Sequence, residues 1–480
     1  LCAGILTPKE MLEGFSNKGM ITVALLFLVS EGIRQSGTLG QVIKKLLPQG
    51  KTTVFKAQLR ILPSVAFISA FLNNTPVVVI FAPIIKHWAK SVKLPATKFL
   101  IPLSYVTILG GICTLIGTST NLVVHGMILE AGYEGFTMFE LGKVGIFIAI
   151  AGIIYLFIFS KRLLPDARPD TAVPDEEVEE GEKLHRVEAV LGARFPGINK
   201  KLSDFNFQRH YGAEVKEIKT RNGQRYVNHL EDVVLREGDT LVVMADDTFI
   251  PTWGESSVFV LLTNGNDPDT SGKKKRWLAL ILLVLMIVGA TVGELPATKE
   301  MFPDIKLDMF FFVCITTIIM AWTNIFPARK YTKYISWDIL ITIACAFAIS
   351  KAMVNSGVAD CVAGFIIGLS DDYGPHVLLA ILFVITNLFT ELITNNAAAA
   401  LAFPLALSIS AQLGVSPTPF FVVICMAASA SFSTPIGYQT NLIVQGIGNY
   451  KFTDFVRIGL PLNIITFLIS VILIPLIWNF

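Results

Sequence analysis

Apolar segments long enough to cross a membrane recur along most of this chain. Continuous segments lie at residues 16–36, 138–161, 277–296, 307–323, 336–353 and 456–478. About 20 apolar residues in a helix span the roughly 30 Å of bilayer hydrocarbon. Charged residues make up only 16% of the chain, whereas a soluble domain carries about 25%. The sequence therefore predicts an all-α polytopic membrane protein.

Net charge and cysteine spacing exclude several functional classes. The net charge is +2, which gives no strong field for a nucleic-acid partner. The six cysteines contain no CxxC pair, so we interpret them as buried thiols rather than disulfides or metal ligands. No nucleophile–base pair or metal-ligand cluster stands out, which argues against an enzyme.

Four other apolar stretches are interrupted by short polar motifs. They are 56–88, broken by Asn73-Asn74-Thr75; 98–130, broken by Gly117-Thr118-Ser119-Thr120-Asn121; 376–412, broken by Thr394-Asn395-Asn396; and 417–447, broken between Ser433 and Asn441. Irregular backbone persists at mid-membrane only where protein, water or a ligand satisfies it. Helix N-termini at such breaks favour anions, and C-terminal carbonyls favour cations. We therefore expect one bound anion flanked by two Na⁺-like cations.

A hydroxyl residue precedes each asparagine motif by four residues. Ser69 precedes Asn73, and Thr390 precedes Thr394; this spacing places both members of a pair on one helix face. Each hydroxyl offers a further oxygen to a cation, the alternative being a bond to a carbonyl one turn earlier. For the asparagines, the alternative to a binding site is hydrogen bonding between helices.

The acids Glu130 and Glu391 lie within or near apolar segments. Intramembrane acids are functional candidates by default, but neither has a matching acid in the other half of the chain. We leave both outside the predicted site, along with His125, which we expect to pack or to form a hydrogen bond.

The two apolar halves repeat each other at an offset of 320 or 321 residues. Asn74 matches Asn395 and Asn121 matches Asn441. Basic residues flank both ends of 56–88, but almost none flank 376–412, so the two segments should enter the membrane from opposite sides. This predicts an inverted repeat with two re-entrant hairpins and two broken helices, which is typical of secondary transporters. By symmetry, we expect about two N-terminal helices of the first repeat to be missing from this sequence.

A polar stretch separates the halves, so we divide the chain into residues 1–164, 165–276 and 277–480. The middle part opens on an acidic linker (Pro165–Glu182) and closes on Lys273–Arg276. We expect strands at 187–191 and 213–218, a helix at 198–209, a hairpin turn at 221–223, a turn followed by a buried strand within 235–243, and linker at 248–262. Basic residues at both ends place this small α+β domain in the cytoplasm and the C-terminus outside.

The two motifs and the two turns resemble those of the divalent anion/sodium symporter family, which carries sulfate or di- and tricarboxylates. In that family, Ser-Asn-Thr motifs lie at the tips of opposed re-entrant hairpins. Here the middle asparagine is kept in both motifs, as Asn74 and Asn395. The signature at 235–243 makes the inserted domain similar to the TrkA C-terminal type, which is found in bacterial members.

The resemblance implies a set of site residues. Those expected to face the substrate are Asn73, Asn74, Thr75, Thr118, Thr394, Asn395, Asn396 and Thr434. Those expected to hold Na⁺ are Ser69, Asn74 and Gly117 at one site, and Thr390, Asn395 and Ser433 at the other. It further implies a homodimer in the bacterial inner (plasma) membrane, in contact with lipid, with elevator-type alternating access and a small ligand for the inserted domain.

Several functions stay open at this point. We favour Na⁺-coupled symport of sulfate, because amides and helix ends alone can surround a small tetrahedral anion. The alternatives are a Na⁺/dicarboxylate symporter of the same fold, a proton-coupled or arsenite-type exporter, and a non-transporting anion sensor.

Overall fold

The computed structural model describes residues 4–48, 50–166, 185–192, 194–220, 224–246, 249, 253, 258–263, 273–302, 305–327, 329, 331–368 and 374–480. The expected acidic linker beyond Asp166 and the turn at 221–223 lie outside these residues.

The first membrane part is built of helices joined by loops. Its helices are α1 (Pro8–Glu13), η1 (Gly14–Ser16), α2 (Lys18–Gln35), α3 (Thr38–Leu46), α4 (Val54–Ser69), α5 (Asn74–Ser91), η2 (Ala96–Lys98), α6 (Leu100–Gly111), α7 (Ser119–Glu130) and α8 (Gly142–Leu163). The breaks between α4 and α5 and between α6 and α7 fall at the two predicted motifs.

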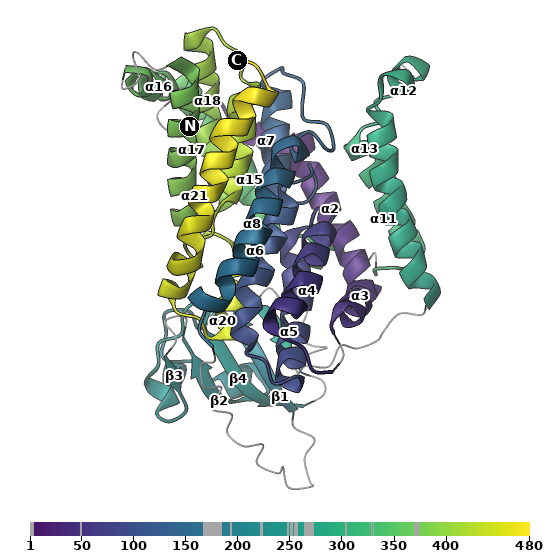
Figure 1. Ribbon diagram of the computed structural model, residues 1–480, viewed down its shortest axis with the longest axis vertical. Coiled ribbons are helices and arrows are strands. Elements are labelled where there is room, and N and C mark those ends of the chain that lie inside the picture. Colours follow the sequence, from purple (N-terminus) through teal and green to yellow (C-terminus); the bar gives the residue numbers. More distant parts are fainter. Residues whose placement is uncertain are drawn as a thin grey trace.

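The second membrane part is also helical. Its helices are α11 (Lys273–Gly293), α12 (Pro296–Met301), α13 (Met309–Trp322), α14 (Tyr331–Tyr334), α15 (Trp337–Asn355), α16 (Val358–Gly368), α17 (Gly374–Leu392), α18 (Asn395–Leu413), α19 (Thr418–Ser429), α20 (Gln439–Gly448) and α21 (Phe452–Ile477). The α4–α5 hairpin opens toward the end that carries the sheet, and the α17–α18 hairpin opens toward the opposite end (Figure 1).

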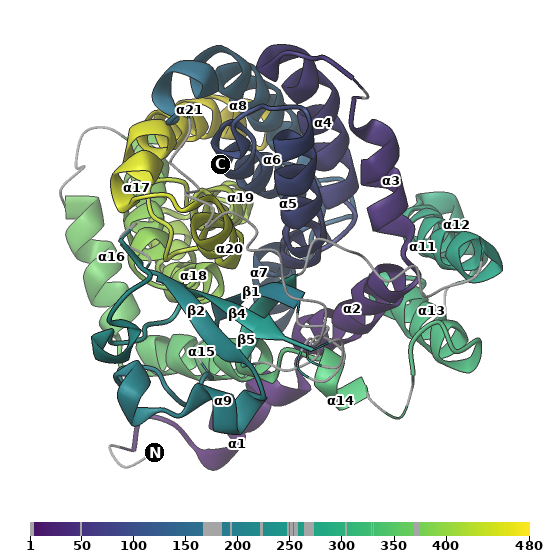
Figure 2. The same cartoon turned by 90° about the horizontal axis from the view of Figure 1, so that it is seen from below.

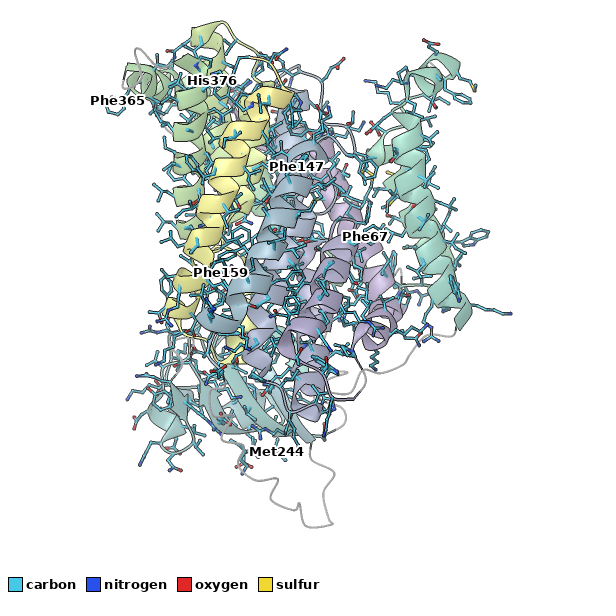
Figure 3. The ribbon with its side chains drawn as sticks, viewed as in Figure 1. Phe67, Phe147, Phe159, Met244, Phe365 and His376 are labelled. Atoms are coloured by element: carbon cyan, nitrogen blue, oxygen red, sulfur yellow. The ribbon has the colours of Figure 1, made fainter. Side chains whose placement is uncertain are left out.

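Six helices in the described part of the chain are long and apolar enough to cross a membrane, or seven if the pair α15 and α16, bent by 71°, counts as one span. The outer face of α8 carries bare apolar side chains: Phe147 is 55% exposed, and it and Phe159 lie on the bundle's outer surface (Figure 3). Such a surface suits lipid rather than water. The predicted polytopic membrane protein is confirmed.

The polar middle part folds into a five-stranded antiparallel sheet at one end of the bundle (Figure 2). Its elements are β1 (His185–Leu191), η3 (Leu202–Asp204), α9 (Phe207–Tyr211), β2 (Glu214–Lys219), β3 (Arg225–Tyr226), η4 (Leu230–Asp232), β4 (Thr240–Ala245) and β5 (Phe259–Thr263). The strand order is β3-β2-β4-β1-β5. Aromatic side chains, including Phe195 and Tyr211, fill its separate core.

Two expectations about this domain are wrong in detail. The helix expected at 198–209 is the short η3 followed by α9, because the Asn206 side chain accepts from the backbone N of Arg209 (3.0 Å) and so starts a new helix. Part of the expected linker is β5, which pairs with β1.

The sheet contacts the two helices that lead away from the broken segments. On β1, Glu188 accepts from Lys86 Nζ of α5 at 3.0 Å and from Lys219 Nζ of β2 at 3.2 Å. Gly446 of α20 lies so close to β4 that a Cβ there would be 2.7 Å from Thr240 Oγ1. The inserted domain is thus packed directly on α5 and α20.

This ion-paired contact should weaken in acid. Burial alone would raise the pKa of Glu188, but the ammonium groups of Lys86 and Lys219 outweigh it and lower that pKa from 4.5 to about 2. A carboxylate with a lowered folded-state pKa stabilises the fold above its unfolded pKa, and this stability is lost as pH falls through the folded pKa. We therefore expect the thermal midpoint to fall between pH 5 and about pH 2.

Calorimetry of the purified protein at several pH values measures this, with Glu188→Gln as the control. The variant should unfold at a lower temperature at pH 7 and respond less to acid. Equal pH responses of the two proteins would contradict the assignment.

Candidate functional site

The first asparagine motif is held by a buried hydrogen-bond network. Asn74 is the first residue of α5 and is fully buried. In the amide orientation that satisfies all its neighbours, Nδ2 donates to Ser69 Oγ (2.8 Å), Thr107 O (3.0 Å) and Gly117 O (3.2 Å). Its Oδ1 accepts from the hydroxyl of Tyr438 (2.5 Å). One side chain therefore joins α4, α6, the α6–α7 break and the second half of the chain.

The second motif has the same local arrangement. Thr390 Oγ1 at the end of α17 lies 2.8 Å from Asn395 Oδ1 at the start of α18 and 2.6 Å from Ala428 O. Both side chains are buried. The Ser69–Asn74 and Thr390–Asn395 pairs thus have equal separations at the tips of the two hairpins.

The two broken helices are fixed by equivalent asparagines. Asn121 Nδ2 donates to Thr114 O (2.9 Å), and Asn441 Nδ2 donates to Thr434 O (3.1 Å). The backbone N of Gly117 donates to Thr114 Oγ1 (3.2 Å). These bonds satisfy the irregular backbone that the interior would otherwise leave unpaired.

Side chains from the two halves meet between the breaks. Thr118 Oγ1 lies 3.0 Å from the Tyr438 hydroxyl. Thr75 Oγ1 donates to Gln439 Oε1 (3.3 Å), and Ser119 Oγ donates to Asn396 Oδ1 (3.2 Å). Both hairpin tips and both broken helices therefore converge on one place, built of amides, hydroxyls and helix N-termini.

Comparison with known proteins agrees with this architecture. A family model described as citrate transporter matches residues 1–414 and, in a second match, residues 301–480. The chain belongs to the citrate transporter family. The resemblance to divalent anion/sodium symporters is thereby confirmed, and the family match points to a transporter rather than an enzyme. The TrkA C-terminal likeness of the inserted domain stays a prediction.

Three relatives illustrate the proteins to which this chain is similar. An uncharacterised transporter of Synechocystis sp. is 30% identical over 99% of this chain and 91% of its own length. A probable sodium/sulfate cotransporter 3 of Chlamydomonas reinhardtii is 22% identical over 96% of this chain and 82% of its own. The sodium-dependent dicarboxylate transporter SdcS of Staphylococcus saprophyticus is 25% identical over 30% of this chain and 28% of its own.

In this citrate transporter family member, the predicted residues fall into two groups. Asn74, Thr75, Thr118, Asn395 and Asn396 lie in the convergent network. Ser69 and Gly117, which bond to Asn74, and Thr390, which bonds to Asn395, belong to the same network. The remaining four, described in the next two paragraphs, lie at its margins: Asn73, Thr394, Ser433 and Thr434.

Asn73 is half-buried and, with Ser119 and with Ser30 of α2, lines a small cavity. Thr394 is exposed at the hairpin tip.

Thr434 and Ser433 lie in the loop between α19 and α20, and their hydroxyl groups bond that loop to α17 and α21. Thr434 Oγ1 donates to Glu391 O (3.1 Å), and Ser433 Oγ accepts from Asn463 Nδ2 (2.9 Å).

Across the described residues, no group of three or more His, Cys, Asp and Glu side chains could hold a metal ion. A cation bound among the described residues would therefore take most of its ligands from neutral oxygens.

Sequence reasoning missed Tyr438 and Gln439. The signal was present, because Tyr438 and Gln439 stand 320 residues after Thr118 and Ser119, the same offset that relates the asparagines. Their partners in the structure are consistent with that offset.

Proposed function

We propose that this chain is a secondary active transporter that couples uptake of a divalent anion, with sulfate favoured, to Na⁺. The observation that carries the proposal is the convergence of two buried asparagines, Asn74 and Asn395, at breaks from both halves of the chain. Helix N-termini there favour an anion, and the adjoining carbonyls and hydroxyls favour cations. A relative over 96% of the chain bears the name sodium/sulfate cotransporter.

An inverted repeat is part of this proposal. Exchanging the halves at the offset of 320 or 321 turns Thr75–Gln439 into Asn396–Ser119, and both pairs are hydrogen-bonded. The same exchange turns Thr118 into Tyr438, and these two residues bond to each other. A two-fold axis through the Thr118–Tyr438 contact accounts for both facts.

The proposed binding residues follow from this symmetry. Substrate contacts come from Asn73, Asn74, Thr75, Thr118, Thr394, Asn395, Asn396 and Thr434. One Na⁺ site combines Ser69, Asn74 and Gly117, and the other combines Thr390, Asn395 and Ser433. We also propose a homodimer in the plasma membrane with a cytoplasmic sheet, an external C-terminus and an elevator-type cycle.

Uptake of radiolabelled sulfate into proteoliposomes, with and without an inward Na⁺ gradient, tests the proposal. We expect uptake that requires Na⁺ and that excess succinate does not inhibit. Uptake driven by a pH gradient in the absence of Na⁺, or no flux of any divalent anion, would contradict it.

A dicarboxylate is the second candidate substrate. It is favoured by a relative named as a sodium-dependent dicarboxylate transporter; the family's description names citrate, which is a tricarboxylate. Two carboxylates would need two donor clusters farther apart than sulfate does, and the two hairpin tips supply two. In the same assay, Na⁺-dependent succinate uptake without sulfate flux would select this candidate, and citrate uptake without either would point to a tricarboxylate.

Tyr438→Phe should weaken anion binding without unfolding the protein. The change removes the hydroxyl that contacts Asn74 and Thr118, each contact being worth about 1 kcal/mol. We expect the anion concentration for half-maximal uptake to rise about 5- to 20-fold. Tyr133→Phe, at an exposed tyrosine, is the matched control, and equal kinetics of the two variants would contradict a role for Tyr438.

A further inference from the structure

A carboxylate lies beside the second break, outside the residues assigned so far. Glu391 follows Thr390 on α17, and its Oε1 accepts from the backbone N of Ser433 (2.8 Å) and from Asn463 Nδ2 of α21 (2.7 Å). Asn463 Nδ2 also donates to Ser433 Oγ (2.9 Å). Side chains of α17 and α21 therefore meet on the loop that precedes α20.

Two oxygens of this cluster lack a donor. Glu391 Oε2 and Asn463 Oδ1 are both buried, and neither has a hydrogen-bond partner among the residues that the structure describes. Asn463 as a whole is only 6% exposed. Buried acceptors without a donor are costly, most of all a carboxylate at membrane depth. Both orphaned atoms are acceptors on adjacent, hydrogen-bonded groups, and a cation is the kind of ligand that such acceptors bind.

The cluster has no counterpart in the first half of the chain. At the offset that relates the halves, Glu391 corresponds to Ala70 and Ser433 to Cys113. The local backbone bonds are nevertheless equivalent, because Thr114 Oγ1 donates to Ala70 O as Thr434 Oγ1 donates to Glu391 O. The second break thus carries a carboxylate that the first break lacks, although the backbone hydrogen bonds of the two breaks match.

We propose that Glu391 and Asn463, together with Ser433, which also belongs to the second symmetric site, form a further Na⁺ site that binds one coupling ion beyond the two symmetric ones. The proposal rests on the Na⁺-coupled transport proposed above. Carboxylate, amide and hydroxyl oxygens are suitable ligands for a hard cation. Two donors on Oε1 leave Oε2 free to face the ion, whose charge balances the carboxylate.

The test counts Na⁺ ions. Full-length protein in proteoliposomes is assayed for the ratio of ²²Na⁺ to radiolabelled anion taken up, for the wild type, Glu391→Gln and Glu134→Gln. Glu134 is an exposed acid after α7 and serves as the matched control. We expect Glu391→Gln to carry about one Na⁺ fewer per anion, with the control unchanged.

A binding measurement covers the case in which Glu391→Gln does not transport. The rise in thermal midpoint is measured against Na⁺ concentration, without anion, for the wild type and Asn463→Leu. Gel filtration first shows that both proteins are folded. Loss of one oxygen ligand should raise the Na⁺ concentration for half-maximal stabilisation about tenfold.

Two results would overturn the site: an unchanged ion ratio in Glu391→Gln, or an unchanged Na⁺ titration in Asn463→Leu. A ratio that loses one proton instead of one Na⁺ also overturns it, because the carboxylate would then titrate rather than bind Na⁺. Failure of the proposed function is distinct, since it would show as wild-type protein without Na⁺-dependent uptake.

Discussion

Alanine at Asn74 or at Asn395 should abolish Na⁺-dependent anion uptake while leaving a folded protein. Each amide lies at the start of a helix and satisfies buried groups from neighbouring elements. Removing Asn74 leaves several polar atoms unpaired, at about 1–3 kcal/mol each, and removing Asn395 takes away one of the two partners of Thr390 Oγ1. Because the same atoms are proposed to position substrate and Na⁺, we expect uptake to fall by about 100-fold or more.

The measurement is initial uptake rate, with gel filtration and thermal midpoint as checks of folding. Asn355→Ala is the matched control, because that asparagine is exposed and its side chain donates to the peripheral residues Ile5 and Glu10. Near-normal uptake by Asn74→Ala and Asn395→Ala would remove both residues from the site. A loss confined to one of them would contradict the two-fold arrangement.

A side chain at Gly459 should disrupt the binding site, although Gly459 itself is not one of the site residues. Gly459 lies on α21, and a Cβ there would be 1.9 Å from Phe432 O and 2.8 Å from the backbone N of Ser433. No rotation of a side chain relieves a clash with backbone. Gly459→Val must therefore displace α21 or the loop before α20, and overpacking of this kind costs about 3 kcal/mol.

Thermal unfolding and uptake together measure this effect. We expect a clearly lowered midpoint and little remaining transport. Gly368→Ala is the control, because that glycine on α16 has open space where a Cβ would be. A Gly459→Val protein as stable and active as the control would mean that α21 does not press on the loop as described.

Hydropathy and polar motifs predicted where the helices break, because a polar run inside an apolar segment has few folded solutions. Both asparagine motifs start helices, α5 at Asn74 and α18 at Asn395. The sharp bend between α15 and α16 escaped prediction, since hydropathy measures burial in lipid but not the direction of a helix.

The parts of the site that the sequence did not reveal depend on tertiary contact. Tyr438 reads as one more aromatic residue in an apolar segment until it is seen against Asn74 and Thr118. Glu391 was noticed as an acid, but its importance lies in Asn463, which is 72 residues away along the chain and supplies a second unsatisfied oxygen. No local pattern predicts such a pairing.

The direct contact between the sheet and the membrane helices has a practical consequence. Lys86 binds Glu188 near the far end of the helix that begins at Asn74, and β4 lies against the helix that follows Tyr438. Any rigid displacement of these helices must carry the sheet along or break the ion pair. A pair of spectroscopic labels, one on the exposed face of the sheet and one on α8, would therefore report motion inside the bilayer from a surface that aqueous reagents reach.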